Sequence, residues 1–420
     1  MTSRELVIET LNHRQADRVP VDLGGTVLTG MQVSTVYRLR QALKLDPPGT
    51  PVKVIDSFQM LGEIKPDLLA AVGGDVVNVA LPYTMFGFPN ADWKPWTTFD
   101  GTPVLLPGGF NTEPDEGGDL LQYPQGDRSV PPSGKMPKGG FYCDAIVRQG
   151  PIDEDNLNPA DNLEEFQLLP DSDVAYLKAA TERAYNGTDK AIVLNLPGTA
   201  FGDIAFVPGP ALKHPKGIRD IEEWYMSTAM RKDYVVAVFA RQCEIALQNL
   251  ERIYAAVGNM PTAVVVRGTD FGAQNGPFVS PRAFKTLYMP YLKRINDWIH
   301  AHTTWKTFIH SCGSIMPLIP FMIEAGFDIL NPVQTSAANM SARELKAKFG
   351  DRLTFWGGGV DTQHTLPTAT PDEIRREVQG VLETFAPGGG FMFAAIHNVQ
   401  QGVPAENLLA MFETVRNFKF

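Results

Sequence analysis

Short apolar runs rich in β-branched residues alternate with longer helical patterns along most of this sequence, and this alternation constrains its fold more than any other feature. Eight runs are candidate strands: Val19–Leu23, Asp75–Leu81, Ala191–Leu196, Ala263–Arg267, Thr307–Ser311, Asp328–Val333, Leu353–Gly357 and Gly390–Ile396. They lack polar alternation, which is typical of strands buried on both faces of a parallel sheet. Eight strand–helix units favour an α/β fold, a (β/α)8 TIM barrel in which residues 1–420 form a single domain. The alternative is a doubly wound open sheet, but no Gly-x-Gly-x-x-Gly follows the first strand.

Longer segments with helical periodicity lie between these runs. They cover Ile221–Ala255, Pro281–Ala301, Met316–Ala325, Ser341–Phe349 and Pro371–Phe385. The capping-box spacing of Thr2 and Glu5 predicts a helix at the start of the chain, and a last helix is expected from about Ala405. Between about residues 82 and 158 the sequence is instead rich in Gly, Pro, Asp and aromatic residues. We expect this region to form an excursion of loops and short strands after the second strand.

Charge and cysteine content narrow the class of protein. The 37 basic and 47 acidic residues give a formal net charge of −10, which argues against general binding to nucleic acids or anionic membranes. Three cysteines in 420 residues do not form a disulfide framework and suit a reducing compartment. The sequence shows neither a signal-peptide pattern nor 18 uninterrupted apolar residues. We therefore expect a cytoplasmic protein, monomeric or oligomeric, that acts on a small molecule without a membrane or nucleic-acid partner.

Polar residues gather where the expected strands end, which in a TIM barrel is the catalytic face. These residues are Asp22, Asn78, Asn195, Asp270, His310, Cys312, Asn331, Gln334, Asp361, His397 and Asn398. We predict catalytic roles for Asp270 and Asp22. We predict substrate binding by Asn195, Gln334, Asp361 and Asn398. As an alternative, Asp and Asn side chains at such positions cap turns and helices.

The sharpest motif is Phe-Ile-His-Ser-Cys-Gly-Ser, which contains His310 and Cys312. Side chains alternate along a strand, so both residues point to the same face where one strand ends. Imidazole and thiolate both bind zinc, and we predict a zinc site in which His397, at the end of the last strand, is the third ligand. In the alternative interpretation Cys312 is a small buried apolar residue and His310 a hydrogen-bonded core residue. His397 in turn can be a general acid or base, or can fix a loop.

The last third of the chain, roughly Asp270 to Met411, resembles the uroporphyrinogen decarboxylase superfamily. The matching stretches are DFGAQNGPFVSPRAFKTLYMPYLKRI, FIHSCGSIMPLIPFMIEAGFDILNPVQ, WGGGVDTQHTLP and GVPAENLLAM, with RVPVDLGGT and GGDVVNVALP nearer the start. The resemblance implies a (β/α)8 barrel. Uroporphyrinogen decarboxylases themselves carry Arg-Gln-Ala-Gly-Arg after the first strand. The similar run from Arg14 to Arg18 precedes the first strand here, so we expect it at the wrong end of the barrel for that role.

Another branch of the superfamily contains zinc methyltransferases that work with corrinoid proteins. Its pattern is His-x-Cys after the fifth strand and a Cys after the last strand. His310 and Cys312 match the first part, whereas His397 stands where the branch has Cys. Zinc bound by one thiolate and two imidazoles carries a formal charge of +1 and is a stronger Lewis acid than the neutral two-thiolate site.

The resemblance and this departure favour a demethylase-type methyltransferase. It would move a methyl group from a small methoxylated or methylated substrate to a corrinoid carried by a partner protein. The aromatic residues from Phe86 to Phe99 could wall the substrate pocket or dock that partner. The alternative is a metal-free decarboxylase, which would need a basic pocket, and only Arg267 lies at an expected strand end. A non-catalytic binding barrel is a third alternative, against which the clustered polar strand ends count.

Overall fold

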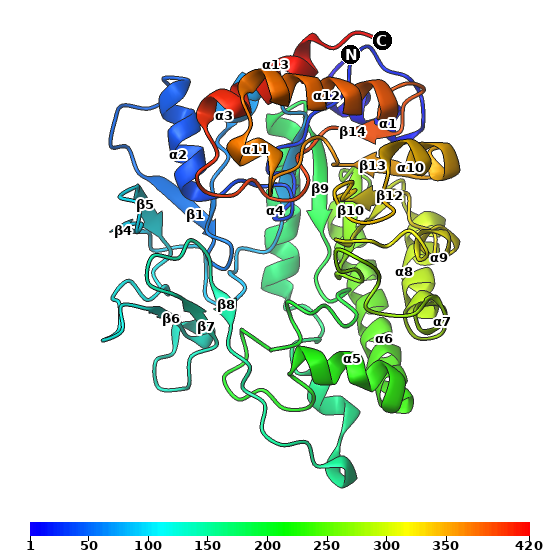
Figure 1. The fold of residues 1–420 in the computed structure, drawn as a ribbon. Helices are drawn as coiled ribbons and strands as arrows, with labels where there is room; N and C mark the ends of the chain where they lie inside the picture. The colour runs from blue at the N-terminus through cyan, green and yellow to red at the C-terminus, as the bar shows by residue number, and fades with distance from the viewer.

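A curled parallel sheet forms the centre of the computed structural model, which describes residues 1–420 apart from the side chain of Arg267 (Figure 1). In this described chain the sheet has seven strands in the order β14-β13-β12-β11-β10-β9-β3, and each neighbouring pair is parallel. The strands are β3 (Val76–Val79), β9 (Ala191–Asn195), β10 (Ala263–Gly268), β11 (Lys306–His310), β12 (Ile329–Asn331), β13 (Thr354–Trp356) and β14 (Phe391–Met392). Seven of the eight expected runs therefore contain strands of one α/β sheet.

The first expected strand, around Val21, is instead a single-residue link between the two edges of the sheet. Val21 makes one parallel bridge to Phe393, just beyond β14, and another to Gly74, just before β3. Pro20 has no amide hydrogen to donate, and Gly24 turns the chain with a φ of 78°. These two residues limit the pairing on either side of Val21. The expectation of eight full strands is thus corrected to seven strands and one bridging segment in the described chain.

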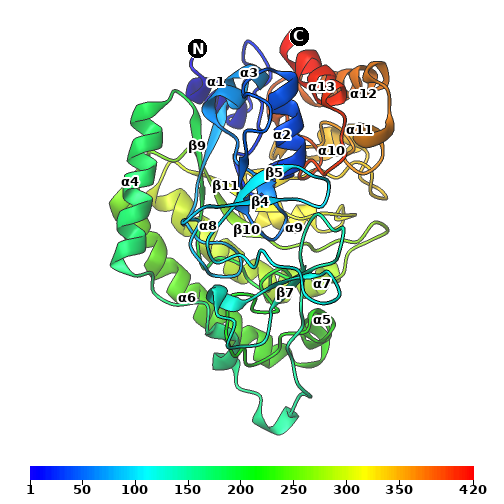
Figure 2. The same ribbon diagram turned by 90° about the vertical axis from the view of Figure 1, so that its left-hand side faces the viewer.

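Helices pack around the outside of the sheet, with α4 and α6 along one side of the molecule (Figure 2). The helices are α1 (Ser3–Leu11), α2 (Val33–Ala42), α3 (Pro66–Val72), α4 (Asp171–Gly187), α5 (Ile221–Met230), α6 (Lys232–Val257), α7 (Pro281–Ala283), α8 (Met289–His302), α9 (Ile319–Glu324), α10 (Ala342–Phe349), α11 (Thr365–Thr368), α12 (Pro371–Phe385) and α13 (Ala405–Asn417). Thr2 and Glu5 form the predicted capping box of α1. The single helix expected over Ile221–Ala255 is two helices, because the backbone leaves the helical region at Arg231. None of the helices in the described chain is long and apolar enough to cross a bilayer.

An apolar layer fills the inside of the curled sheet. Its buried members include Phe308, Ile329, Trp356 and Met392, together with Val7 and Leu11 of α1. His310 lies two residues after Phe308 in β11, and Asn331 lies two residues after Ile329 in β12. Because strand side chains alternate, His310 and Asn331 continue this inward-facing layer toward the C-terminal end of the barrel.

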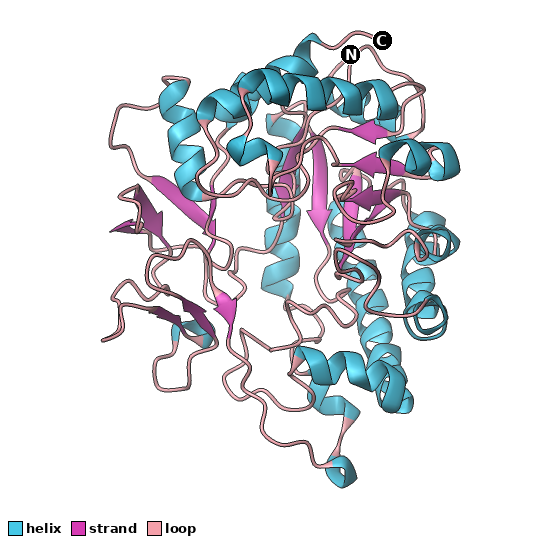
Figure 3. Ribbon diagram, in the orientation of Figure 1, coloured by secondary structure: helices cyan, strands magenta, loops and turns pink.

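The excursion consists mostly of loops and short strands (Figure 3), as expected. Its strands are β4 (Lys94–Thr97), β5 (Pro103–Leu106), β6 (Leu120–Gln122), β7 (Gly134–Met136) and β8 (Asp144–Ala145). Two earlier strands, β1 (Val52–Asp56) and β2 (Leu61–Gly62), were not expected, and β1 pairs with β5. Phe86 and Phe88 are buried and stack with a centroid distance of 6.3 Å. These two aromatic residues therefore pack in the excursion's core, whereas Phe99 is partly exposed, and a role of the aromatic residues from Phe86 to Phe99 in a pocket wall or a partner contact stays a prediction.

Candidate metal centre

Three potential metal ligands meet at the C-terminal end of the barrel. His310 ends β11, Cys312 follows it by two residues, and His397 lies in the segment after β14. One ligand atom from each side chain lies within 4.8 Å of the other two. Two strands separate β11 from β14 in the sheet, so the curl of the sheet brings His397 to the other residues. The structure thus brings together the three residues that the sequence predicts as metal ligands.

The spacing of the His310 and Cys312 ligand atoms fits a zinc ion. His310 Nε2 lies 3.4 Å from Cys312 Sγ, and the imidazole rings of His310 and His397 have a centroid distance of 5.2 Å. Tetrahedral zinc with ordinary Zn–N and Zn–S bonds places a nitrogen and a sulfur ligand about 3.6 Å apart. His397 has a φ of 66°, a backbone conformation that residues other than glycine rarely adopt and that is concentrated at functional sites.

Burial favours the uncharged forms of two of the ligands. Burial and the nearby Asp270 carboxylate raise the pKa of the Cys312 thiol well above its usual range. Burial and the neighbouring His310 lower the pKa of His397 to about 4. Neutral imidazole is the form that binds metals, and a divalent cation converts a thiol ligand to thiolate. One thiol and two imidazoles that converge in this way suit a borderline-soft cation such as zinc.

Asp270, which the sequence predicts as catalytic, lies beside these ligands. Its Oδ1 atom accepts a hydrogen bond of 2.8 Å from the backbone N–H of Cys312 and lies 3.7 Å from His310 Nε2. The Asp270 side chain is 33% exposed, so it combines proximity to the ligands with access from solvent. The hydroxyl of Tyr225, on α5, donates to the Asp270 carbonyl at 2.7 Å and anchors this loop. The position suits substrate contact or proton transfer, and the catalytic role stays a prediction.

A chain of hydrogen bonds behind His310 is not apparent from the sequence. His310 Nδ1 contacts Asn331 Oδ1, and Asn331 Nδ2 donates to the Trp356 carbonyl at 2.7 Å. The Trp356 indole N–H donates to Asp22 Oδ2, also at 2.7 Å. Asp22 is buried, which raises its pKa to about 6. Asp22 is thus connected to His310 through Asn331 and Trp356, and its predicted catalytic role is not tested by these contacts.

Two of the residues predicted to bind substrate link neighbouring segments at the same end of the barrel. Asn195, at the end of β9, donates from Nδ2 to Asn78 Oδ1 at 2.7 Å. Gln334, three residues after β12, accepts through Oε1 a 2.7 Å hydrogen bond from the backbone N–H of Gly313. Gly313 follows Cys312 directly, so Gln334 holds the loop that carries the thiol. Substrate contact by Asn195 and Gln334 stays a prediction.

The other two predicted substrate-binding residues also hold loops. Asn398 is fully buried, and its side-chain amide is hydrogen-bonded to Gly30, Val27 and Gln59. Asp361 accepts hydrogen bonds from the backbone N–H groups of Gln363 and His364, as a turn cap does. Either residue would have to share or exchange one of these bonds to contact a substrate, and that role stays a prediction.

The arginines near the start of the chain lie away from this centre. Arg18 forms two hydrogen bonds with Asp75, which precedes β3 and so lies at the N-terminal end of the barrel. Arg14 pairs with Glu9 at 3.1 Å, and both side chains are partly exposed. The Arg14–Arg18 run is therefore at the end opposite the candidate site, as expected. The side chain of Arg267 lies outside the described part of the chain.

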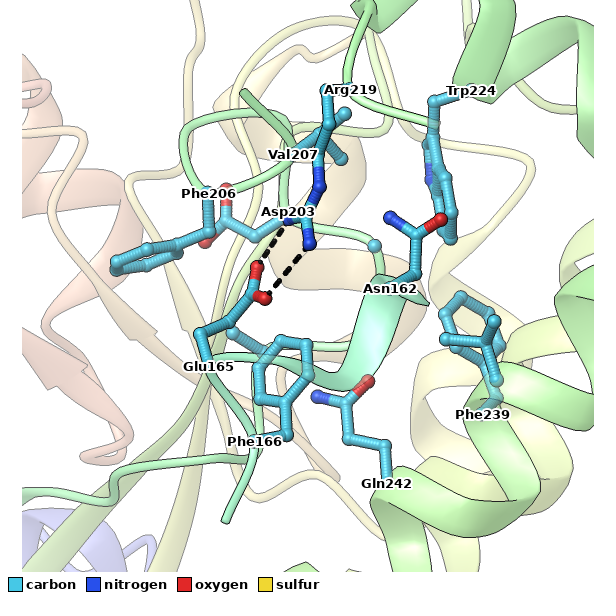
Figure 4. A pocket seen from close by; sticks show the side chains of 13 residues that line it. Asn162, Glu165, Phe166, Asp203, Phe206, Val207, Arg219, Trp224, Phe239 and Gln242 are labelled. Carbon is cyan, nitrogen blue, oxygen red and sulfur yellow. Dashed lines mark hydrogen bonds and ion pairs between the residues drawn. The ribbon is translucent and has the colours of Figure 1, made fainter. Parts of the chain in front are cut away.

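A small cavity lies apart from the candidate ligands, between the loop after β9 and helices α5 and α6 (Figure 4). Arg219 and Glu165 form an ion pair of 2.7 Å on one side of it, and Trp224 and Gln242 contribute to the other walls. The cavity volume is about 20 Å³, which suits about one water molecule. It is too small for an organic substrate, and none of the predicted site residues lines it.

Part of the chain is similar to a known protein family. Residues 217–418 match the uroporphyrinogen decarboxylase family. A uroporphyrinogen decarboxylase from Pseudoalteromonas atlantica is 21% identical over 211 residues, which is 46% of this chain and 56% of that protein. One from Psychromonas ingrahamii is 26% identical over 137 residues, 31% of this chain and 36% of that protein. The matched segments thus span about half of the length of the first relative and about a third of the second.

A solved structure extends the similarity in fold to the whole chain. A methyltransferase from Methanosarcina mazei superposes with a TM-score of 0.54 at 16% sequence identity, covering 100% of this chain and 99% of that one. At this identity the likeness concerns the fold. The match to the uroporphyrinogen decarboxylase family covers residues 217–418, which include the strands from β10 to β14, and the similarity in fold extends over the whole chain.

Proposed function

We propose that this chain is a zinc-dependent methyltransferase of the demethylase type. It binds zinc through His310, Cys312 and His397 and moves a methyl group from a small methoxylated or methylated substrate to a corrinoid protein. The observation that carries the proposal is the convergence of these three side chains within 4.8 Å at the catalytic end of the barrel. The full-length similarity in fold to a methyltransferase supports it.

The donor set determines the chemistry that zinc would supply. One thiolate and two neutral imidazoles leave a formal charge of +1, which suits polarising the oxygen of a methyl ether. When a methyl group leaves as a cation equivalent, that oxygen keeps the bonding electron pair and takes up a proton. Asp270 is beside Cys312 and reachable from solvent, so it is placed to orient the substrate or exchange this proton. The buried Phe308 below His310 keeps water away from the inner side of the site.

A metal-free decarboxylase is the second candidate, because the curated relatives are uroporphyrinogen decarboxylases. Such an enzyme needs cationic groups for a substrate with several carboxylates. Apart from Arg267, whose side chain lies outside the described part of the chain, the polar residues named at the strand ends are acids, amides, imidazoles and a thiol. Arg18 is engaged with Asp75 at the opposite end of the barrel. The composition of the site therefore supports the metal-dependent proposal over this one.

Metal analysis of protein purified without added zinc tests the proposal, and about one zinc per chain is expected. His310→Ala and Cys312→Ala should each lose most of this metal and keep the circular dichroism spectrum, because they lie at the rim and not in the apolar core. His364→Ala, at a histidine whose side chain is 78% exposed, and Cys243→Ala, at a cysteine buried on α6, are the matched controls and should keep the metal. A wild-type protein without zinc, or a Cys312→Ala variant that fails to fold, would favour the decarboxylase or a packing role.

Methyl transfer can be measured with free cob(I)alamin as the acceptor and a panel of methoxylated aromatic compounds and methylated amines as donors. Formation of methylcobalamin should depend on zinc and should be lost in His310→Ala. If the zinc-loaded protein methylates cob(I)alamin from methylamines but from no ether, the proposal of ether demethylation is wrong while the methyltransferase assignment stands.

A further inference from the structure

The hydrogen bonds behind His310 determine which of its nitrogens faces the ligand cluster. A backbone carbonyl only accepts hydrogen bonds, so the 2.7 Å contact at the Trp356 carbonyl must be made by the Asn331 amide nitrogen. The Asn331 amide oxygen therefore faces His310 Nδ1, with which it is in contact. An amide oxygen also only accepts, so Nδ1 must carry the hydrogen. The lone pair of neutral His310 is then on Nε2, the atom that lies 3.4 Å from Cys312 Sγ.

The sheet holds Asn331 in the position that this requires. His310 and Asn331 are paired residues of the neighbouring parallel strands β11 and β12, and the next residue, Ser311, donates its N–H to the Asn331 carbonyl at 2.8 Å. Asn331 is fully buried, so water does not compete for its side chain. The amide is thus fixed by strand pairing on its backbone and by a carbonyl acceptor on its side chain.

The next residue in the chain is equally constrained. Trp356 is fully buried, and its ring packs edge-on against Phe308 with a centroid distance of 5.4 Å. Its indole N–H donates to Asp22, whose other oxygen accepts the backbone N–H of Gly25 at 2.7 Å. The carbonyl that orients Asn331 therefore belongs to a residue that is itself fixed. The indole N–H of Trp356 is hydrogen-bonded to Asp22, and its ring packs against Phe308. Rotation of the Asn331 amide would place its NH2 group against His310 and its oxygen against a carbonyl.

We propose that Asn331 is a positioning residue that selects the tautomer of His310 with the hydrogen on Nδ1 and so presents Nε2 to a metal. This inference rests on the proposed zinc site for its consequence, but the tautomer is a property of the protein itself. Hydrogen bonds from metal-bound histidines to such partners commonly contribute tenfold to hundredfold in metal affinity. The Asn331 amide adds no charge to the site, so the formal +1 of the zinc centre is preserved.

The experiment compares Asn331→Ala and Asn331→Asp with the wild type. Long-range 1H–15N spectra of histidine-labelled, metal-free protein at pH 7.5 report the tautomer of His310, which is assigned by the signal missing from His310→Ala. The wild type should show hydrogen on Nδ1, and Asn331→Ala should lose this preference. Aspartate in its protonated form accepts from Nδ1–H and donates to the Trp356 carbonyl, so Asn331→Asp should restore it. Asn407→Ala is the matched control, because Asn407 is also buried and also donates to backbone carbonyls, on α13.

Zinc affinity, measured by competition with a chromogenic chelator, is the second readout. Asn331→Ala should bind zinc about tenfold to hundredfold more weakly, whereas Asn331→Asp and Asn407→Ala should stay within about threefold of the wild type. Hydrogen on Nε2 in the wild type, or an unchanged tautomer and zinc affinity in Asn331→Ala, would overturn the inference. If Asn331→Ala does not fold, a folded Asn331→Asp that loses the tautomer would overturn it equally. A wild type that shows the tautomer but binds no zinc would refute the proposed function, and the tautomer of the variants would still decide the role of Asn331.

Discussion

Replacing Arg18 by alanine should weaken the fold without slowing the reaction. Arg18 makes hydrogen bonds of 2.7 and 2.6 Å to the carboxylate of Asp75, which is fully buried. The carboxylate would keep its hydrogen bonds from Ser3 Oγ and the Val21 N–H. Arg18 is 42% exposed, so solvent screens part of the ion pair. A loss of about 2 kcal/mol in the free energy of unfolding is expected, which is typical of lost hydrogen bonds to a charged group and below the cost of breaking a fully buried pair.

Urea denaturation followed by circular dichroism measures this loss as a lower midpoint at an unchanged slope. Arg14→Ala is the matched control from the same run of residues. Its side chain is 64% exposed and pairs with Glu9 at the surface, so its unfolding free energy should change by less than about 0.5 kcal/mol. Turnover should stay within tenfold of the wild type in both variants. An Arg18→Ala protein of normal stability whose turnover falls more than tenfold, about 1.4 kcal/mol of barrier, would refute the reasoning and revive the decarboxylase.

Further expectations concern His397 and the excursion. His397→Cys should keep zinc but slow ether cleavage, because a second thiolate lowers the formal charge of the zinc site. Full zinc occupancy in His397→Ala would instead show that His397 is not a ligand. The lowered pKa of His397, about 4 against 6.5, means that the unfolded chain takes up its proton first, so metal-free protein should lose about 3 kcal/mol of stability as the pH falls from 7 to 4. Urea titrations at both pH values should show a loss that is larger by this amount in the wild type than in His397→Ala, in which carboxyl groups of lowered pKa such as Asp67 and Asp328 still contribute. Phe86→Ala should cost about 3–5 kcal/mol, because the ring is fully buried, and a normal urea midpoint with altered substrate preference would instead place Phe86 at the pocket.

The buried strands of the sheet were predictable because their chemistry is local. The apolar runs at Ala191–Asn195 and Ala263–Gly268 pair on both sides and face apolar layers, so they carry a strong pattern. The strand predicted over Val19–Leu23 was wrong, because Pro20 lacks the amide hydrogen that a paired strand residue donates. So short an apolar run does not reveal this interruption in its hydrophobic pattern. Strand β1 was missed because it is only partly buried, and strand β2 was missed because it has only two residues.

The candidate site shows the same division between local and long-range information. His310 and Cys312 share a face because strand side chains alternate, so their proximity follows from spacing alone. His397 is distant in sequence, and only the curl of the sheet brings it near, so the strand count and the resemblance were needed to predict it. Nothing in the sequence distinguishes Asn331 from Asn195, another amide at a strand end. Its contact with His310 depends on strand register and on which carbonyl lies behind it, and neither is encoded locally.

Closure of the sheet through Val21 has a consequence for the mechanics of the barrel. The seam between β14 and β3 rests on one bridge to either side of Val21, the shortest pairing among the described strands of the ring. His397 stands just beyond that seam, whereas His310 and Cys312 extend from β11 in the middle of the sheet. A cation bound by all three residues would link the segment after β14 to β11, so the pairing at Val21 could not separate fully without the loss of a metal ligand. Amide hydrogen exchange at Val21 and Phe393 should therefore slow on zinc binding by more than exchange in β10 does.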